Sequence, residues 1–270
     1  MKTLRDNVQA AAKKASYPLF IPFIMAGDPD KETTIQLALA LEEQGAHILE
    51  LGIPYSDPLA DGPVLQRSAE RARGQGITLE KSLTLIPEMR KRGLTIPVVI
   101  FTYYNPILQF GEDRFINCAK ESGADGVLVP DLPFEESQEF AKNAKENGLS
   151  FISLVAPTSK HRIEKIAKEA QGFLYCVSSL GVTGTRENFP PEAFSFIKQV
   201  KKHAEVPVAV GFGISKKEHV KDLQGSCDGV IIGSAIMKEV EKHKDRLKKE
   251  SEREEAINSL KEFVAGIISS

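Results

Sequence analysis

The sequence predicts an α/β protein that folds as a single (β/α)8 TIM barrel with an extra N-terminal helix, and three observations predict it. Eight short apolar runs recur along the chain, rich in Val, Ile, Leu and Phe rather than strictly alternating with polar residues. Strands buried on both faces have this composition, as in a parallel sheet. Helical patterns separate the runs, and the 270 residues match the roughly 250 of such a barrel.

The expected strands alternate with the expected helices along the whole chain. The strands are residues 19–25, 47–53, 97–102, 125–130, 150–155, 173–178, 207–211 and 229–233. Strand–helix alternation repeated eight times is typical of a closed barrel, so we expect one domain over residues 1–270. An open doubly wound sheet is the structural alternative, but it usually has fewer strands, and no GxGxxG motif follows the first run.

The expected helices carry start and stop signals. Thr78 is a plausible N-cap for one of them. Residues 4–15 predict the extra helix before the first strand, and the charged segment 235–250 precedes a final helix at 252–268. Four helices end at a glycine suited to a left-handed C-cap, and they span residues 31–45, 78–93, 135–148 and 160–172.

Composition and charge exclude several classes of function. The net charge of −2 gives no basic surface for nucleic acid, and no stretch approaches the ~20 apolar residues of a membrane helix. The first residues lack the apolar region of a signal peptide. Three widely separated cysteines (118, 176 and 227) are typical of reduced thiols, so we expect a cytoplasmic protein. The five histidines form no pair at metal-ligand spacing, so we expect no metal site.

Glycine-rich turns follow the last three expected strands, at residues 178–186, 211–215 and 233–235. Active sites of these barrels lie at the C-terminal strand ends, and phosphate commonly binds after strands 7 and 8. Glycines let backbone amides approach an anion, although a tight turn alone would also explain them. We expect these amides to bind phosphate, with the Ser234 hydroxyl and Thr183, since no lysine lies at the centre of the site.

Two acids mark the opposite side of the same barrel face. Glu50 lies inside the second apolar run, where burial would raise its pKa and suit it to acid–base catalysis. Asp61 follows in a loop stiffened by Pro54 and Pro58. The alternative is that Glu50 caps a backbone or pairs with a base and that Asp61 merely forms a turn. A strand acid and a loop acid nevertheless make a usable catalytic pair.

The residues that are missing narrow the chemistry. Schiff-base aldol chemistry needs a lysine at a strand end, and metal-assisted aldol chemistry needs clustered ligands; the eight runs offer neither. Metal-free proton transfer on a phosphorylated substrate remains. Apolar side chains in or after the strands could line its pocket or be ordinary core: Phe23, Phe101, Leu128, Ile152, Tyr175 and Phe212.

Seven ordered motifs together resemble one family, the tryptophan synthase alpha chain. "LELGIPYSDPLADGPVLQ" at 49–66 is the most diagnostic and holds both acids. The others are "PFIMAGDP" (22–29), "YYNP" (103–106), "GVLVPDLPFEES" (126–137), "SSLGVTGTR" (178–186), "VGFGIS" (210–215) and "GVIIGSAI" (229–236). The resemblance covers essentially the whole chain. It implies a lyase that cleaves indole-3-glycerol phosphate to indole and glyceraldehyde 3-phosphate by a metal-free retro-aldol reaction in tryptophan biosynthesis.

The resemblance also implies roles for residues at matching positions. Glu50 matches the glutamate that helps protonate indole C3 and takes the proton of the glycerol 3′-hydroxyl. Asp61 matches the aspartate that stabilises positive charge at the indole nitrogen, and Thr183 matches the threonine that helps close the site over it. The implied phosphate contacts are Gly184, Gly213, Gly233 and Ser234, and the implied indole pocket is Phe23, Leu128, Tyr175 and Phe212.

The resemblance implies a partner, the pyridoxal-phosphate-dependent tryptophan synthase beta chain, in an α2β2 complex. The loop 55–63 and the segment near Asn105 and Asp131 would face that chain. Pyridoxal phosphate would belong to the partner, so no cofactor is expected here. Two residues depart from the family: Ser179 stands where some members carry arginine, and Pro130 where others have a small residue.

Three alternatives to this function remain open at the level of sequence. A related phosphate-binding barrel, such as a phosphoribosyl isomerase or indole-glycerol-phosphate synthase, is one, although the synthase would need a strand-end lysine. A stand-alone indole-3-glycerol-phosphate lyase would perform the same chemistry without a beta chain. A catalytically idle regulatory subunit would only activate its partner, although intact Glu50 and Asp61 argue against it.

Overall fold

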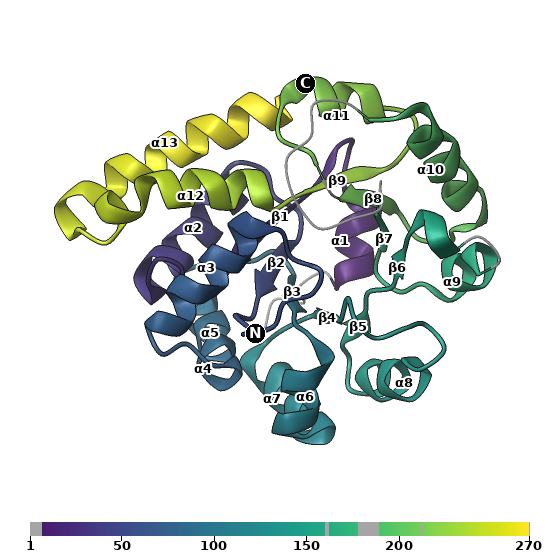
Figure 1. Cartoon of the computed structure of the whole chain (residues 1–270), viewed down its shortest axis with the longest axis horizontal. Coiled ribbons are helices and arrows are strands. Elements are labelled where there is room, and N and C mark those ends of the chain that lie inside the picture. Colours follow the sequence, from purple (N-terminus) through teal and green to yellow (C-terminus); the bar gives the residue numbers. More distant parts are fainter. Residues whose placement is uncertain (1–6, 160–161, 178–188, 212, 270) are drawn as a thin grey trace.

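A single parallel sheet forms the centre of the molecule in a computed structural model that describes residues 7–159, 162–177, 189–211 and 213–269 (Figure 1). Its order is β5-β4-β3-β2-β1-β9-β8-β7-β6, and every described pair of strands is parallel. The strands are β1 (Leu19–Met25), β2 (Leu49–Gly52), β3 (Val98–Phe101), β4 (Gly126–Leu128), β5 (Ser150–Phe151), β6 (Leu154–Val155), β7 (Leu174–Val177), β8 (Val208–Gly211) and β9 (Gly229–Ile232).

The sheet closes into a barrel through the segment that contains β5 and β6. These two strands stand at opposite ends of the sheet order, yet only Ile152 and Ser153 separate them in the chain. The Ile152 amide donates to the Val127 carbonyl at 2.8 Å, whereas the Tyr175 amide donates to the Ser153 carbonyl at 3.0 Å. The fifth expected strand therefore pairs with β4 through its first half and with β7 through its second. The predicted fold class is confirmed.

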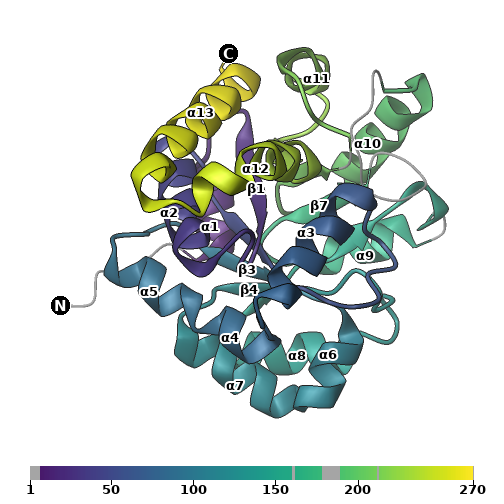
Figure 2. The same cartoon turned by 60° about the vertical axis from the view of Figure 1, so that its left-hand side comes forward.

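Helices surround the sheet and cover its outer face, except α1, which lies within the ring of strands in the view of Figure 1 (Figures 1 and 2). They are α1 (Val8–Lys14), α2 (Lys31–Glu43), α3 (Pro63–Gly74), α4 (Leu79–Leu83), α5 (Leu85–Lys91), α6 (Tyr104–Phe110), α7 (Glu112–Ser122), α8 (Gln138–Glu146), α9 (Ile163–Glu169), α10 (Pro191–His203), α11 (Lys217–Leu223), α12 (Ser234–Leu247) and α13 (Glu250–Ile268). None of the helices in the described part of the chain combines the length and the apolar character that crossing a membrane requires.

Three of the four predicted stop signals hold in the structure. Gly45, Gly93 and Gly148 each directly follow the C-cap of a helix and have φ between 82° and 106°. The fourth does not hold, because α9 ends at Glu169 with an extended C-cap at Ala170, and Gly172 lies beyond that helix. Thr78 caps α4 by accepting a hydrogen bond from the Lys81 amide at 3.3 Å. The helix expected over 78–93 is divided at Thr84 into α4 and α5. Pro87 has no amide hydrogen to donate to the turn before it, which accounts for the break.

Helix α1 closes the barrel at the N-terminal ends of the strands. Val8 and Ala12 are buried in the cluster of side chains that fills the barrel interior. A Cβ atom added at Gly172 would come within 2.7 Å of the Val8 side chain, and one at Gly126 within 3.5 Å. Both glycines lie at or just before the start of a strand, so α1 seals this end and leaves the other end open for a site.

Candidate active site

A cavity of about 220 Å³ lies at the C-terminal ends of the strands. It is bounded by the ends of β6 and β7 and by the segments that follow β4, β8 and β9. Its described lining residues include no lysine or arginine. They are Phe23, Glu50, Ala60, Leu65, Phe101, Pro130, Leu154, Ala156, Ser159, Tyr175, Val177, Gly213, Ile214, Ile231, Gly233 and Ser234.

Glu50 enters this cavity from the middle of β2. It pairs in register with Phe23 of β1 and Val99 of β3, and its side chain is 1% exposed. Its Oε1 atom has no hydrogen-bond partner among the described residues. Burial raises the pKa of Glu50 from 4.5 to about 8, because the charged form loses its hydration. Glu50 therefore carries a proton at neutral pH.

Asp61 lies in the loop between β2 and α3, where backbone contacts fix its position. Its amide donates to the Pro58 carbonyl at 3.0 Å, and its carbonyl accepts from Gln66 Nε2 at 2.7 Å. The side chain is 3% exposed, and Oδ1 has no partner within the described chain. Burial raises the pKa of Asp61 from 3.8 to about 7, while a hydrogen bond with the Tyr103 hydroxyl opposes that rise.

Two tyrosines join the acids into one site. The Tyr103 hydroxyl accepts a hydrogen bond from the Ala60 amide at 3.0 Å and also bonds the Asp61 carboxyl. Tyr175 of β7 lies so close to both acids that, after burial, their charges are the next largest causes of its raised pKa. Sequence reasoning missed Tyr103, although its place directly after the third apolar run was a usable signal. The structure thus brings Glu50, Asp61 and Tyr175 together.

The glycine turns form the other side of the cavity. Gly213 has a φ of 91°, a conformation that favours glycine, and Gly233 precedes the first residue of α12, Ser234. No side chain caps this helix start. The first amides of a helix lack intrahelical partners and carry partial positive charge, so they suit an anion.

A buried histidine supports the turn after β8. The Ser215 amide donates to His219 Nδ1 at 3.3 Å, and His219 is 1% exposed. Its ring also packs edge-on against Phe189, with centroids 5.3 Å apart. Sequence reasoning missed His219, because a histidine four residues after a glycine turn reads only as an ordinary helix residue. The buried His219 side chain therefore fixes this turn to the protein core.

The remaining predicted residues fall into three groups. Phe23 and Phe101 line the cavity, with ring centroids 5.5 Å apart. Leu128 and Ile152 are fully buried in the barrel interior and are not among the described lining residues. Four positions lie outside the described residues: Ser179, Thr183, Gly184 and Phe212. The contact roles given to all these residues stay predictions.

Several apolar lining residues were not predicted individually. Leu154, Val177 and Ile231 come from strands, and Leu65 comes from the first turn of α3. An apolar run buried on both faces does not reveal which of its residues face the barrel interior.

Among the residues that the structure describes, no group of three or more His, Cys, Asp or Glu side chains could hold a metal ion.

The surface beside the acid loop exposes apolar side chains. Leu59 is 71% exposed and Leu108, on α6, is 51% exposed. Asn105 Nδ2 donates to the Tyr55 hydroxyl at 2.9 Å, joining the acid loop to α6. Asp131 accepts from the Tyr104 amide at 2.9 Å, which adds the loop after β4. The segments expected to face a partner therefore form one continuous surface.

Comparison with known proteins agrees with this geometry. The family model "Tryptophan synthase alpha chain" matches residues 9–265. The tryptophan synthase alpha chain of Geobacillus kaustophilus is 62% identical over 240 residues, which are 89% of this chain and 90% of that protein.

Two solved structures extend the comparison to the fold. A chain described under mutual activation of the tryptophan synthase α2β2 complex from Pyrococcus furiosus has a TM-score of 0.82 and 37% identity, covering 99% of this chain and 100% of that one. Tryptophan synthase subunit alpha from Legionella pneumophila has a TM-score of 0.85 and 34% identity, covering 97% of each chain. The chain belongs to the tryptophan synthase alpha chain family, and thus to the proteins of tryptophan biosynthesis.

Proposed function

We propose that the chain cleaves indole-3-glycerol phosphate to indole and glyceraldehyde 3-phosphate without a metal. One observation carries the proposal: the buried carboxyl of Glu50 and the uncapped start of α12 line one cavity, and the buried carboxyl of Asp61 lies beside its lining residues Ala60 and Tyr175. An indole ring with a phosphorylated side chain has the polarity that this cavity requires at each end.

Substrate binding follows from the walls of the cavity. The phosphate binds the amides around Gly213, Gly233 and Ser234, with the Ser234 hydroxyl as a further donor. The indole ring packs between Phe23 and Tyr175, and its N–H points to Asp61. Thr183, Gly184, Leu128 and Phe212 complete the proposed contacts. Because Glu50 and Asp61 are buried, their carboxyl groups act in a medium of low dielectric.

The proposed proton steps use the raised pKa values. Glu50 is protonated at neutral pH and transfers its proton to indole C3, which makes the ring an electron sink. The positive charge that develops at the indole nitrogen is stabilised by ionised Asp61. Glu50, now a carboxylate, takes the proton of the 3′-hydroxyl while the bond between indole C3 and the glycerol carbon breaks. Indole and an aldehyde leave, and Glu50 ends protonated as it began.

We further propose that the chain acts as the alpha subunit of an α2β2 complex with a tryptophan synthase beta chain. The similarity to the chain from the Pyrococcus furiosus α2β2 complex supports this assembly. The exposed Leu59 and Leu108 beside the acid loop offer an apolar contact surface. Pyridoxal phosphate belongs to the beta chain, and this chain needs no cofactor. Its three cysteines are free thiols, which supports a cytoplasmic location.

The direct test is to incubate the purified protein with indole-3-glycerol phosphate, alone and with a beta chain, and to measure indole. We expect slow release by the chain alone and faster release with the partner. A high rate that the beta chain does not raise would favour a stand-alone lyase. No release under either condition would leave a purely regulatory subunit and refute the proposal.

A further inference from the structure

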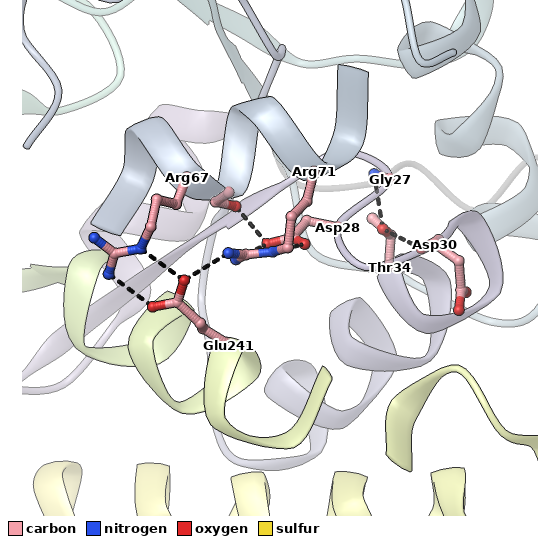
Figure 3. A network of polar contacts seen from close by, with 8 residues as sticks. Gly27, Asp28, Asp30, Thr34, Arg67, Arg71 and Glu241 are labelled. Carbon is pink, nitrogen blue, oxygen red and sulfur yellow. Dashed lines mark hydrogen bonds and ion pairs between the residues drawn. The ribbon is translucent and has the colours of Figure 1, made fainter. Parts of the chain in front are cut away.

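A network of polar contacts holds a buried carboxylate in the loop that follows β1 (Figure 3). Asp28, in the loop between β1 and α2, is 0% exposed. Arg71 of α3 donates to both of its oxygens, from Nε at 2.8 Å and from Nη2 at 2.7 Å. Ser68, one turn earlier on α3, donates to the same carboxylate at 2.6 Å. A bidentate pair of this kind fixes direction as well as distance.

Arg71 extends the network to a second helix. Its Nη1 donates to Glu241 of α12 at 2.7 Å, and Arg67 adds two further bonds to Glu241, each 2.8 Å long. The Arg71 side chain is 18% exposed, whereas that of Arg67 is 50% exposed. Arg71 therefore bridges two carboxylates from the inside, while Arg67 contacts one of them from the surface (Figure 3).

The two bridged helices carry the two halves of the active site at their N-terminal ends. Helix α3 begins two residues after Asp61, and its Gln66 holds the Asp61 carbonyl. Helix α12 begins at Ser234, where the anion is proposed to bind. With a rise of 1.5 Å per residue, Arg71 lies about 12 Å along α3 and Glu241 about 10 Å along α12. The contact between Arg71 and Glu241 therefore joins the two helices at nearly equal distances from their first residues.

We propose that Arg71 is a positioning residue that sets the distance between the acid at the start of α3 and the anion site at the start of α12. This inference rests on the proposed function, because the two half-sites must hold the two ends of one substrate. Neither half-site touches Arg71, so each binds its own part of the substrate without it. Only a substrate that binds to both half-sites at once is affected by a change in the distance between them.

The test compares Arg71→Met with Arg73→Met, which removes an exposed arginine of the same helix that takes no part in the described contacts to Asp28 and Glu241. For each variant, kcat and KM for indole-3-glycerol phosphate are measured, together with the dissociation constants of indole and of inorganic phosphate as separate probes. Misplacement by about 1 Å can cost on the order of 100-fold in rate. We expect Arg71→Met to lower kcat by roughly 10- to 100-fold, with both fragment affinities within about threefold of wild type. Arg73→Met should match wild type.

Hydrogen exchange separates positioning from general damage. In Arg71→Met, amide exchange should accelerate at residues 61–66 and 234–237, but stay at the wild-type rate in α8, which connects β4 to β5 across the barrel from β1. Arg71→Lys keeps the charge without the planar fork and should lose about 10-fold in kcat. If Arg71→Met does not fold, Glu241→Ala replaces it, since it removes the bonds of both Arg71 and Arg67 to α12 and keeps the Arg71–Asp28 pair.

Two results would overturn the inference. One is equal kcat in Arg71→Met and Arg73→Met. The other is a loss in which both fragments bind more weakly and exchange rises throughout the chain, because that pattern describes general destabilisation. If the proposed function is wrong, the wild-type protein itself releases no indole from indole-3-glycerol phosphate. The exchange pattern would still decide whether Arg71 holds the two helix starts in place.

Discussion

At the residue scale, the buried carboxyl of Glu50 links stability to pH. Its pKa is about 8 in the folded chain against 4.5 when exposed. Between these values the unfolded chain has lost the proton and the folded chain has kept it, so the free energy of unfolding falls as pH rises. Above pH 8 the loss is complete. Glu50 thus illustrates a site residue whose burial serves chemistry at the expense of stability.

The variant Glu50→Gln should reveal this cost. It removes the titrating group, so we expect it to be more stable than wild type by about 1–3 kcal/mol at pH 8 and by much less at pH 5. Urea unfolding at the two pH values measures the difference. Glu80→Gln, at a largely exposed position, is the control and should show no such trend. A stability difference between Glu50→Gln and wild type that does not change with pH would contradict the burial of a titrating Glu50.

The rate should depend on both acids. The proposed reaction needs protonated Glu50 and ionised Asp61, whose pKa values are about 8 and about 7. Cleavage should therefore decline below pH 7, as Asp61 gains a proton, and above pH 8, as Glu50 loses one. A pH profile of kcat/KM checks this bell shape. In Tyr103→Phe the acidic limb should move to higher pH, because the lost hydrogen bond lowers the Asp61 pKa in wild type.

Two results would contradict this pH dependence. A rate that rises steadily from pH 6 to pH 9 would show that Glu50 does not act as an acid. An acidic limb that Tyr103→Phe leaves in place would show that another group titrates there.

At the element scale, close contact between strands limits what β9 can carry. Gly229 pairs with Leu19 of β1, and a Cβ atom added there would lie 2.3 Å from the Leu19 carbonyl oxygen. Backbone cannot move away as a side-chain tip can. Gly229→Ala should therefore lower the free energy of unfolding by about 1–3 kcal/mol in urea titration.

Gly266→Ala provides the matched control for Gly229→Ala. Gly266 lies within α13, and a Cβ atom there meets nothing within 4 Å. Alanine favours a helix over glycine by about 1 kcal/mol, so this variant should be neutral or stabilised. Equal destabilisation by both substitutions would contradict the close β1–β9 packing.

Most elements could be predicted, because strands buried on both faces and helices ending at glycine leave strong local patterns. Two divisions were not predicted, and only one of them could have been. The run 150–155 gives no sign that its halves pair with different neighbours, since pairing is a property of the closed sheet. The break at Thr84 was readable from Pro87 but was overlooked. The acids and glycine turns were predictable from their places after strands, whereas the contacts of Tyr103 and His219 depend on how loops fold back.

At the scale of the whole molecule, the extra helix and the site occupy opposite ends of one barrel. Helix α1 seals the N-terminal end, while the acid loop and the exposed Leu59 and Leu108 surround the other. The proposed beta-chain surface thus lies beside the cavity. That residues 1–270 act as a single domain stays a prediction.

Leu108→Glu tests the partner surface. It places a charge on an exposed apolar position of α6, away from the cavity lining. We expect binding to the beta chain to weaken by at least about 10-fold, because burying an unpaired charge costs more than 1.4 kcal/mol. Indole release by the chain alone should be unchanged. Calorimetry that finds wild-type affinity would place the interface elsewhere.

The most direct measurement is indole release from indole-3-glycerol phosphate, with a beta chain present, by wild type, Glu50→Gln and Asp61→Asn. General acid–base groups contribute about 10²–10⁴-fold, so each variant should lose activity within that range while its circular dichroism matches wild type. Near-normal release by Glu50→Gln would contradict the account, since the buried acid of β2 would then have no part in the chemistry.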